Sequence, residues 1–280
     1  MPKAARTSDP NFISSLSRGL SVLEAVAESM EDVPLAKLAS LVGLKKTSTW
    51  RLVRTLVQLG YIRQDPQTRQ FRPAPRILAL GYAYLEGLDL KQMASPFLRD
   101  LSARVDETVN LAILNGDELI YIDRVRTAQI LNINLHVGSR LPLYNTSLGR
   151  ALISDMPEVW MKGYVERIST DPKAKDYVEE DGKKLRKLLK ETQRLGYALN
   201  DEELVKGLRG VASPVRDRTN TIVAAICITV PAGRATLAKL KSDFVMELLR
   251  TADQISYALG YRGKYESRDK SAEASLVRGF

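Results

Sequence analysis

Two stretches of the sequence carry residues that can recognise a charged partner. In the first, residues 45–49 read Lys-Lys-Thr-Ser-Thr, and Arg51 and Arg54 follow on a helix predicted by the apolar spacing of residues 52–59. At a helix start, backbone N–H groups and short side chains can contact phosphate oxygens, and arginine can pair with a guanine edge. The candidate nucleic-acid contacts on this helix are Lys45, Lys46, Thr47, Ser48, Thr49, Arg51 and Arg54.

The charge around this helix favours a polyanionic partner. The protein has 280 residues and a formal net charge of +9. Residues 1–76 hold 12 Lys/Arg and 6 Asp/Glu, a net of +6, whereas residues 77–280 hold 30 and 27, a net of +3. No acidic residue lies between Asp32 and Asp65. We therefore predict a nucleic-acid partner, the alternative being a basic surface that is merely solvated.

The second stretch, residues 138–149, reads Gly-Ser-Arg-Leu-Pro-Leu-Tyr-Asn-Thr-Ser-Leu-Gly. A strand is predicted to end there, a proline-containing loop follows, and a helix begins near Thr146 and Ser147. Unpaired N–H groups at a helix start form an anion site, and Gly149 in the first turn would let a ligand approach the backbone. A small carboxylate suits such a site, and the alternative is a capped helix start without a ligand.

Other reactive residue types lack a catalytic arrangement. The sequence has no Walker loop, no GxSxG and no GxGxxG after a strand. The lone Cys227 and lone His136 exclude an intramolecular disulfide, a Cys-rich zinc site and paired-His metal motifs. We predict no enzyme activity, no metal and no other cofactor. Asp201 and Glu203 lie in an acidic loop that is either a solvated turn or a pocket rim.

Length and composition place the chain among ordinary globular proteins. An apolar fraction of 44% is normal for such proteins, and the length allows two domains. No apolar run approaches the ~20 residues that span a bilayer. Residues 1–15 lack the pattern of a secretory signal. These features predict a cytoplasmic protein that does not bind a membrane.

The elements that must position the basic helix follow one another in residues 13–76. Apolar residues recur with helical spacing from Leu16, Pro34 begins a short second helix, and Gly43 ends it. After the basic helix, two short strands flank a turn at residues 65–68. Helix, short helix, glycine turn, basic helix and hairpin are the layout of a winged helix-turn-helix.

The rest of the chain reads as an α+β domain behind a short linker. The linker helix carries an apolar stripe that must be buried against another surface. We favour a contact with a second copy of the chain. Beyond it, helices accompany hairpins, with strict alternation over residues 129–137 and a doubly apolar strand over residues 222–230. The predicted division is 1–12 tail, 13–76 winged helix, 77–89 linker helix, 90–263 α+β domain and 264–280 tail.

Five segments are distinctive as strings: SLSRGLSVLEAV (15–26), LVRTLVQLGYIRQ (52–64), PRILALGYAYL (75–85), HVGSRLPLYNTSLGRALI (136–153) and GYALNDEELVKGLRGVASPVRD (196–217). They resemble the IclR family of bacterial transcription regulators over nearly the whole chain. Within that family the resemblance is to regulators of the β-ketoadipate pathway, which respond to protocatechuate, 4-hydroxybenzoate or β-ketoadipate. The resemblance implies a winged helix, a linker helix and a GAF-like or profilin-like effector-binding domain with an antiparallel sheet and flanking helices. It also implies homodimers, often paired into homotetramers.

Matched by position, the resemblance implies an effector pocket beside loop 146–149, strand 110–114, the acidic loop 201–203 and the strand around Cys227. The effector's carboxylate would lie on the helix-start amides, and Arg124 and Arg140 are candidate counter-charges. Family members usually have a small residue where this chain has Asn145. The ligand-binding residues expected are Leu111, Ala112, Tyr121, His136, Thr146, Ser147, Leu148, Gly149, Asp201, Glu203 and Cys227.

These expectations amount to a ligand-responsive regulator of aromatic acid catabolism. It would bind double-stranded operator DNA as a dimer or dimer of dimers, and contact RNA polymerase if it activates transcription. The wing residues Thr68, Arg69 and Gln70, together with Arg18, would add contacts to the DNA backbone or minor groove. The alternative is a DNA-binding protein whose C-terminal domain is catalytic.

Overall fold

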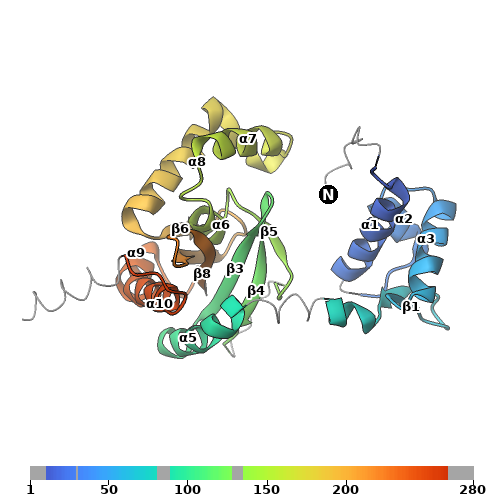
Figure 1. The fold of residues 1–280 in the computed structure, drawn as a ribbon, viewed down its shortest axis with the longest axis horizontal. Helices are drawn as coiled ribbons and strands as arrows, with labels where there is room; N and C mark the ends of the chain where they lie inside the picture. The colour runs from blue at the N-terminus through green and yellow to red at the C-terminus, as the bar shows by residue number, and fades with distance from the viewer. Residues whose placement is uncertain (1–10, 30, 81–88, 128–134, 264–280) are drawn as a thin grey trace, which may run out of the picture. The chain divides into compact units, whose positions relative to one another are not determined.

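The computed structural model describes residues 11–29, 31–80, 89–127 and 135–263. The chain divides into two compact units, Met1–Gly87 and Leu88–Phe280 (Figure 1). No described helix is long and apolar enough to cross a membrane.

The N-terminal unit is a three-helix core with a two-stranded hairpin. Val22, Leu38, Val53, Ile62 and Phe71 are among its buried residues, and they come from all of its elements. The turn between the second and third helices needs a left-handed residue, and Gly43 supplies it with φ +65°. Its elements are α1 (Ser14–Glu28), α2 (Leu35–Leu41), α3 (Lys46–Gln58), β1 (Ile62–Gln64) and β2 (Phe71–Pro73).

The hairpin is tied to the helices through its second strand. β1 and β2 pair antiparallel with Ile62 opposite Pro73. Phe71 also forms an isolated bridge with Val33, which precedes α2. The hairpin is therefore the wing of a winged helix-turn-helix, as predicted.

The C-terminal unit is built on one six-stranded antiparallel sheet in the order β5-β4-β3-β8-β7-β6. β8 lies in the interior of the sheet, which explains why its sequence is apolar on both faces. The strands are β3 (Thr108–Asn115), β4 (Glu118–Val125), β5 (Arg140–Pro142), β6 (Ala198–Asp201), β7 (Leu208–Arg216) and β8 (Ile222–Pro231).

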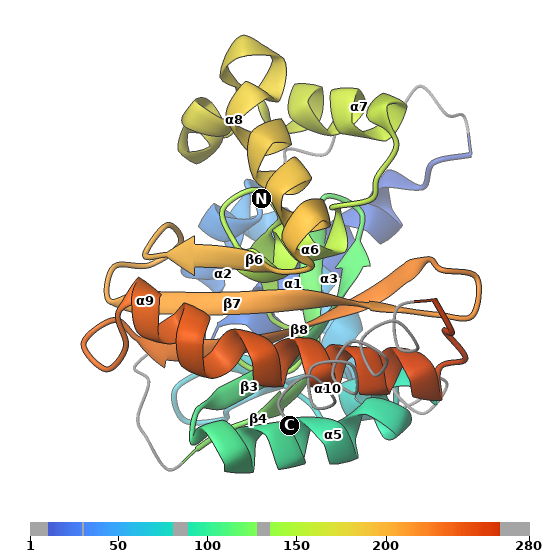
Figure 2. The ribbon, with the colours of Figure 1, turned by 90° about the vertical axis from the view of Figure 1, so that its left-hand side faces the viewer.

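Helices cover both faces of this sheet. α5 (Asp89–Val105) and α10 (Val245–Ala258) pack together on one face (Figure 2). α6 (Ser147–Leu152) packs on the other face, with α7 (Glu158–Ile168) and α8 (Lys175–Leu195) beyond it. Short turns η1 (Pro172–Ala174), α9 (Leu237–Lys239) and the π-helical η2 (Leu240–Phe244) complete the unit. The predicted α+β class with an antiparallel sheet and flanking helices is confirmed.

Some predicted elements fall partly outside the described residues. Of the linker helix predicted over 77–89, residues 77–80 are helical and residues 81–88 lie outside the description, as do residues 1–10 and 264–280 of the tails. The strand predicted over 129–137 lies outside it up to residue 134. Its described part, from residue 135, forms no strand, because Gly138 takes φ +91° and its N–H turns back to Tyr121 O at 2.8 Å.

Candidate functional site

Helix α3 presents one apolar and one cationic face. Val53 and Leu56 are buried in the core of the N-terminal unit, which fixes how the helix is turned. Within the described residues, no ion pair involves any cation of this helix. The predicted contacts that are exposed on it or at its start are Lys45, Lys46, Thr47, Ser48, Arg51 and Arg54.

Thr49 does not belong with these residues. It is 0% exposed, and its hydroxyl donates to Lys45 O at 3.2 Å. The prediction of Thr49 as a nucleic-acid contact is wrong, because its position in the helical repeat turns the side chain into the core. A polar side chain was expected to be exposed, but a threonine can be buried in a helix when its hydroxyl donates to a carbonyl of the preceding turn.

Trp50 is a feature of α3 that the sequence reading missed. The residue is 38% exposed, and its ring packs edge-on against Phe71 of the wing, with centroids 6.4 Å apart. The Arg54 guanidinium lies 5.7 Å from the same ring. Trp50 therefore links the wing to α3 and restricts where Arg54 can point. The sequence did offer a signal for this role, since Trp50 lies among polar residues of an amphipathic helix that are expected to be exposed.

The wing tip is held by backbone contacts that leave its side chains exposed. Asp65 Oδ1 accepts the N–H groups of Gln67 at 2.9 Å and Thr68 at 2.8 Å, and these bonds lower the pKa of the Asp65 carboxyl. Arg69 adopts φ +57°, and its carbonyl accepts from Gln64 Nε2 at 2.9 Å. Thr68 and Arg69 are exposed, Gln70 is half-buried, and Arg18 is exposed on α1.

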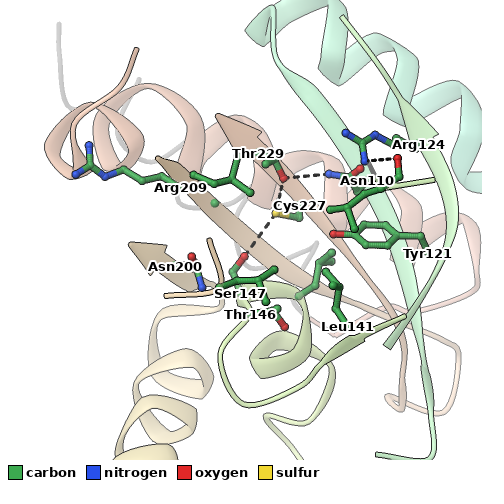
Figure 3. A pocket seen from close by; sticks show the side chains of 15 residues that line it. Asn110, Tyr121, Arg124, Leu141, Thr146, Ser147, Asn200, Arg209, Cys227 and Thr229 are labelled. Atoms are coloured by element: carbon green, nitrogen blue, oxygen red, sulfur yellow. Dashed lines mark hydrogen bonds between the residues drawn. The ribbon is translucent and has the colours of Figure 1, made fainter. Parts of the chain in front are cut away.

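The C-terminal unit contains a pocket between the sheet and the start of α6 (Figure 3). Its empty space is about 510 Å³, a volume that includes the opening to solvent. Sheet pairing sets its floor, since Asn110 of β3 lies between Arg124 of β4 and Cys227 of β8. The lining residues are Asn110, Tyr121, Arg124, Leu135, Leu141, Thr146, Ser147, Leu148, Asn200, Leu204, Leu208, Arg209, Gly210, Cys227 and Thr229.

A chain of weak polar contacts crosses the floor. Asn110 Nδ2 donates to Thr229 Oγ1 at 3.0 Å, and Cys227 Sγ lies 3.5 Å from both Thr229 Oγ1 and Ser147 Oγ. Burial raises the pKa of the Cys227 thiol and that of the Tyr121 hydroxyl, so both groups are neutral. The floor therefore offers neutral hydrogen-bonding groups within an apolar wall.

Two lining groups have buried polar atoms without a hydrogen-bond partner. Asn110 is 2% exposed, and among the described residues its Oδ1 accepts no hydrogen bond and Arg124 Nε donates none. A buried polar atom left unpaired costs about 1–3 kcal/mol. A polar ligand that reached these atoms would recover this free energy.

The start of α6 is capped from within the protein. Thr146 Oγ1 accepts the Gly149 N–H at 3.0 Å and donates to Pro142 O at 2.7 Å. A Cβ on Gly149 would lie 2.3 Å from both Cα and O of Leu143. Gly149 is outside the pocket lining, so the expectation that it admits a ligand is wrong: its missing side chain serves packing against Leu143.

Five other predicted ligand residues lie outside the pocket lining. Leu111 and Ala112 are 0% exposed and belong to the core, because the pleat and the depth of β3 direct them away from the opening. His136 is exposed in a turn, with its ring Nδ1 3.2 Å from Ser139 Oγ. Asp201 pairs with Arg209 at 2.6 Å, and Glu203 pairs with Arg150 at 2.7 Å. These two acids are occupied by the protein's own cations and do not form the predicted rim.

The structure brings Tyr121, Thr146, Ser147, Leu148 and Cys227 together around the pocket. Their binding of a ligand stays a prediction. Of the candidate counter-charges, Arg124 lines the pocket and Arg140 does not. Several lining residues were not predicted from the sequence. Thr229 could have been, because side chains alternate along a strand and Thr229 therefore shares a face with Cys227. The lining residues that the reading did not name are Leu135, Leu141, Asn200, Leu204, Leu208, Arg209, Gly210 and Thr229.

A winged helix with an exposed basic helix, joined to a separate pocket-bearing α+β unit, defines a two-domain DNA-binding regulator. Residues 15–66 match the IclR helix-turn-helix domain, and residues 82–257 match the C-terminal domain of the bacterial transcriptional regulator IclR. The chain belongs to the IclR family. Members of this family are transcriptional regulators and not enzymes, which excludes the alternative of a catalytic C-terminal domain.

Known relatives cover nearly the whole chain. The Pca regulon regulatory protein of Pseudomonas putida is 33% identical over 257 residues, which are 91% of this chain and 87% of the relative. An IclR family regulator from Brucella abortus is 28% identical, with a TM-score of 0.75 over 92% of this chain and 96% of that one. An IclR homologue from Microbacterium hydrocarbonoxydans, complexed with 4-hydroxybenzoate, shares the fold at 23% identity, with a TM-score of 0.70 over 88% and 98%.

Proposed function

We propose that this regulator senses a small aromatic or dicarboxylic acid and controls genes of aromatic acid catabolism. The observation that carries the proposal is a pocket whose wall is apolar and whose buried Asn110 and Arg124 keep unpaired polar atoms. The relative in P. putida is named for the Pca regulon, and the M. hydrocarbonoxydans homologue was crystallised with 4-hydroxybenzoate. Both support the β-ketoadipate-pathway subgroup and an effector of the 4-hydroxybenzoate, protocatechuate or β-ketoadipate class.

A ligand screen tests the effector class. We expect 4-hydroxybenzoate, protocatechuate or β-ketoadipate at 100 times its dissociation constant to stabilise the protein by about 2.7 kcal/mol against unfolding. Differential scanning calorimetry measures this effect, with 4-hydroxybenzyl alcohol as a control that lacks the carboxylate. If none of these acids raises the unfolding temperature, the proposed effector class is wrong.

In this proposal α3 lies in the major groove and reads the operator. The wing residues Thr68, Arg69 and Gln70, with Arg18, contact the DNA backbone or the minor groove and set no base preference. The positioning of Arg54 by Trp50 supports this arrangement. On α3 and at its start, the proposed contacts are Lys45, Lys46, Thr47, Ser48, Arg51 and Arg54.

Substitutions on α3 test the recognition helix. We expect Arg51→Ala to weaken binding to the preferred DNA site by about 1–3 kcal/mol if the guanidinium reads guanine, with relaxed preference at one base pair. If it contacts phosphate only, the loss is similar on all sequences and the salt slope falls by about one unit. The site is first selected from random DNA with the unsubstituted protein, and Kd is measured at several salt concentrations.

Arg99→Ala is the matched control for charge, because Arg99 is exposed on α5 of the other unit. It should leave Kd unchanged at physiological salt, where long-range charge effects are screened. A double variant Arg51→Ala/Arg54→Ala that binds as tightly as the unsubstituted protein would refute the assignment of α3.

The regulator acts as a homodimer or dimer of dimers in this proposal. The N-terminal unit exposes Leu16 by 60% and Leu20 by 51% on one face of α1. Leu78 and Leu80, in the described start of the linker helix, are 73% and 58% exposed. Exposed apolar stripes of this kind favour a second copy as their cover. Action in the cytoplasm, and contact with RNA polymerase if the protein activates, complete the proposal.

A further inference from the structure

Arg124 is the cation that faces the pocket without a carboxylate. It is opposite Asn110 in the pairing of β4 with β3, and Asn110 is opposite Cys227 in the pairing of β3 with β8. Arg124 Nη1 donates to Leu135 O at 2.7 Å, and its Nε has no partner in the part of the chain that the structure describes. Figure 3 shows its side chain at the edge of the pocket, on the side of Asn110 and Tyr121.

Positive charge is concentrated at this edge. Arg126 lies two residues further along the chain, and its Nη2 donates to the same carbonyl, Leu135 O, at 2.9 Å. Among the residues that the structure describes, no carboxylate lies within ion-pair distance of either guanidinium. Two like charges that share one acceptor repel each other, and an anion beside them would relieve that repulsion.

The other lining arginine is already neutralised. Arg209 pairs with Asp201 at 2.6 Å and with Glu202 at 3.2 Å, and its Nη1 donates to the carbonyls of Ala232 and Ala235. Its donors are therefore occupied by the protein. Both arginines line the pocket, but only Arg124 has an N–H donor without an acceptor among the described residues.

The Gly149 amide is a poorer site for an anion than the sequence indicated. The Gly149 N–H is already bonded to Thr146 Oγ1, and Gly149 itself packs on the Leu143 backbone. Thr146 Oγ1 is in turn engaged with Pro142 O. An anion that took the Gly149 N–H would displace bonds within the protein, whereas an anion at Arg124 would complete an unsatisfied group.

We propose that the carboxylate of the effector binds the guanidinium of Arg124, with the unpaired amide atom of Asn110 holding a neighbouring polar group of the ligand. This rests on the proposed function, since it assigns the anion site of the same pocket. The body of the ligand then lies on apolar side chains such as Leu141 and Leu148. A small acid with an apolar or aromatic body fits this arrangement, and its neutral ester binds without the ionic contact.

The test compares acid with ester in protein variants. Calorimetric Kd values for 4-hydroxybenzoate, protocatechuate and their methyl esters are measured with the full-length protein and with Arg124→Gln, Arg124→Lys and Arg126→Gln. A charge-assisted hydrogen bond that is lost weakens binding by about 10- to 100-fold. We expect Arg124→Gln to bind the acid more weakly by this factor and to bind the ester with unchanged affinity. The preference for acid over ester then disappears.

The other variants separate charge from structure. Arg124→Lys retains a charge and should keep a preference for the acid, at lower affinity. Arg126→Gln loses a cation that bonds the same carbonyl but does not line the pocket, so its acid preference should stay within about threefold of the unsubstituted protein. Unchanged unfolding midpoints and unchanged DNA affinity establish that each variant is folded.

The outcomes distinguish this inference from the proposed function. If the unsubstituted protein binds an acid and Arg124→Gln keeps the full preference for acid over ester, the Arg124 site is wrong and the effector class stands. If the unsubstituted protein binds esters as tightly as acids, or binds neither these ligands nor β-ketoadipate, both the effector class and the Arg124 site are overturned. Loss of acid preference in Arg126→Gln as large as in Arg124→Gln also overturns the assignment.

Discussion

Glu203→Gln is expected to destabilise the C-terminal unit by about 3–5 kcal/mol, because it leaves a buried cation without its counter-charge. The Arg150 side chain is 1% exposed, and its Nη1 and Nη2 reach the two carboxylate oxygens of Glu203 at 2.7 Å and 2.9 Å. Tyr177 of α8 donates to the same carboxylate, and Leu199 O of β6 accepts from Arg150. Glu203 thereby joins α6, β6 and α8.

This pair also gives stability a dependence on pH. Burial by itself raises the pKa of Glu203, but the bonds and the charge of Arg150 outweigh it and hold the pKa below the ordinary value of 4.5. A carboxyl with a depressed pKa contributes stability that is present above its unfolded pKa and is lost as pH falls through its folded pKa. The stability of the unsubstituted protein should therefore fall below about pH 4.5, and Glu203→Gln should lack this component.

Urea unfolding at pH 7 and at descending pH measures both effects. Glu202→Gln is the matched control, since Glu202 is the adjacent residue and its partner Arg209, 3.2 Å away, keeps a second carboxylate in Asp201. It should cost less than about 1 kcal/mol. A Glu203→Gln protein as stable as the Glu202→Gln control would show that Arg150 does not depend on Glu203.

Gly149→Ala is expected to cost about 3 kcal/mol or more, at the upper end of what overpacking costs. The new Cβ would lie 2.3 Å from Cα and O of Leu143 and 2.6 Å from Thr146 Oγ1. Two of these atoms are backbone, which cannot rotate away, so α6 or the Leu143 segment must move. Any effector response would be lost through this displacement, and DNA binding should persist because the winged helix is a separate unit.

The control is Gly233→Ala, because a Cβ there meets nothing within 4 Å. It should be neutral or slightly stabilising, as for Gly→Ala at an unstrained position. Unfolding midpoints compare the two variants, and a DNA-binding assay on the same samples separates the units. Equal midpoints for Gly149→Ala and Gly233→Ala would contradict the packing role of Gly149.

Local signals in the sequence were enough to predict the winged helix. These signals determine the structure of the few residues around them. They are the apolar residues three and four apart, Pro34 at a helix start and Gly43 in a tight turn. The same holds for the antiparallel hairpins of the second unit, whose pairing is between neighbours in sequence. The exposed cations of α3 followed from the same repeat, and Thr49 did not, because a threonine can be either a surface residue or a buried one.

The pocket depended on contacts that no local pattern records. Its lining comes from strands β3 to β8 and the start of α6, together with loop residues, so each lining residue is decided by the packing of distant segments. Alternation in β3 could not show whether Asn110 or Leu111 faces the opening, since that depends on which face α6 covers. Composition likewise could not show that Glu203 faces Arg150 rather than a ligand.

The sequence by itself determined the order of the elements, the basic helix and the family, because periodicity, turn residues and matching segments are properties of the chain. The tertiary structure alone decided which charges are already paired. Asp201 and Glu203 are taken up by Arg209 and Arg150, whereas Arg124 has no carboxylate partner among the described residues. Whether a charge is available to a ligand depends on what lies within a few ångströms of it, and only folding sets those distances.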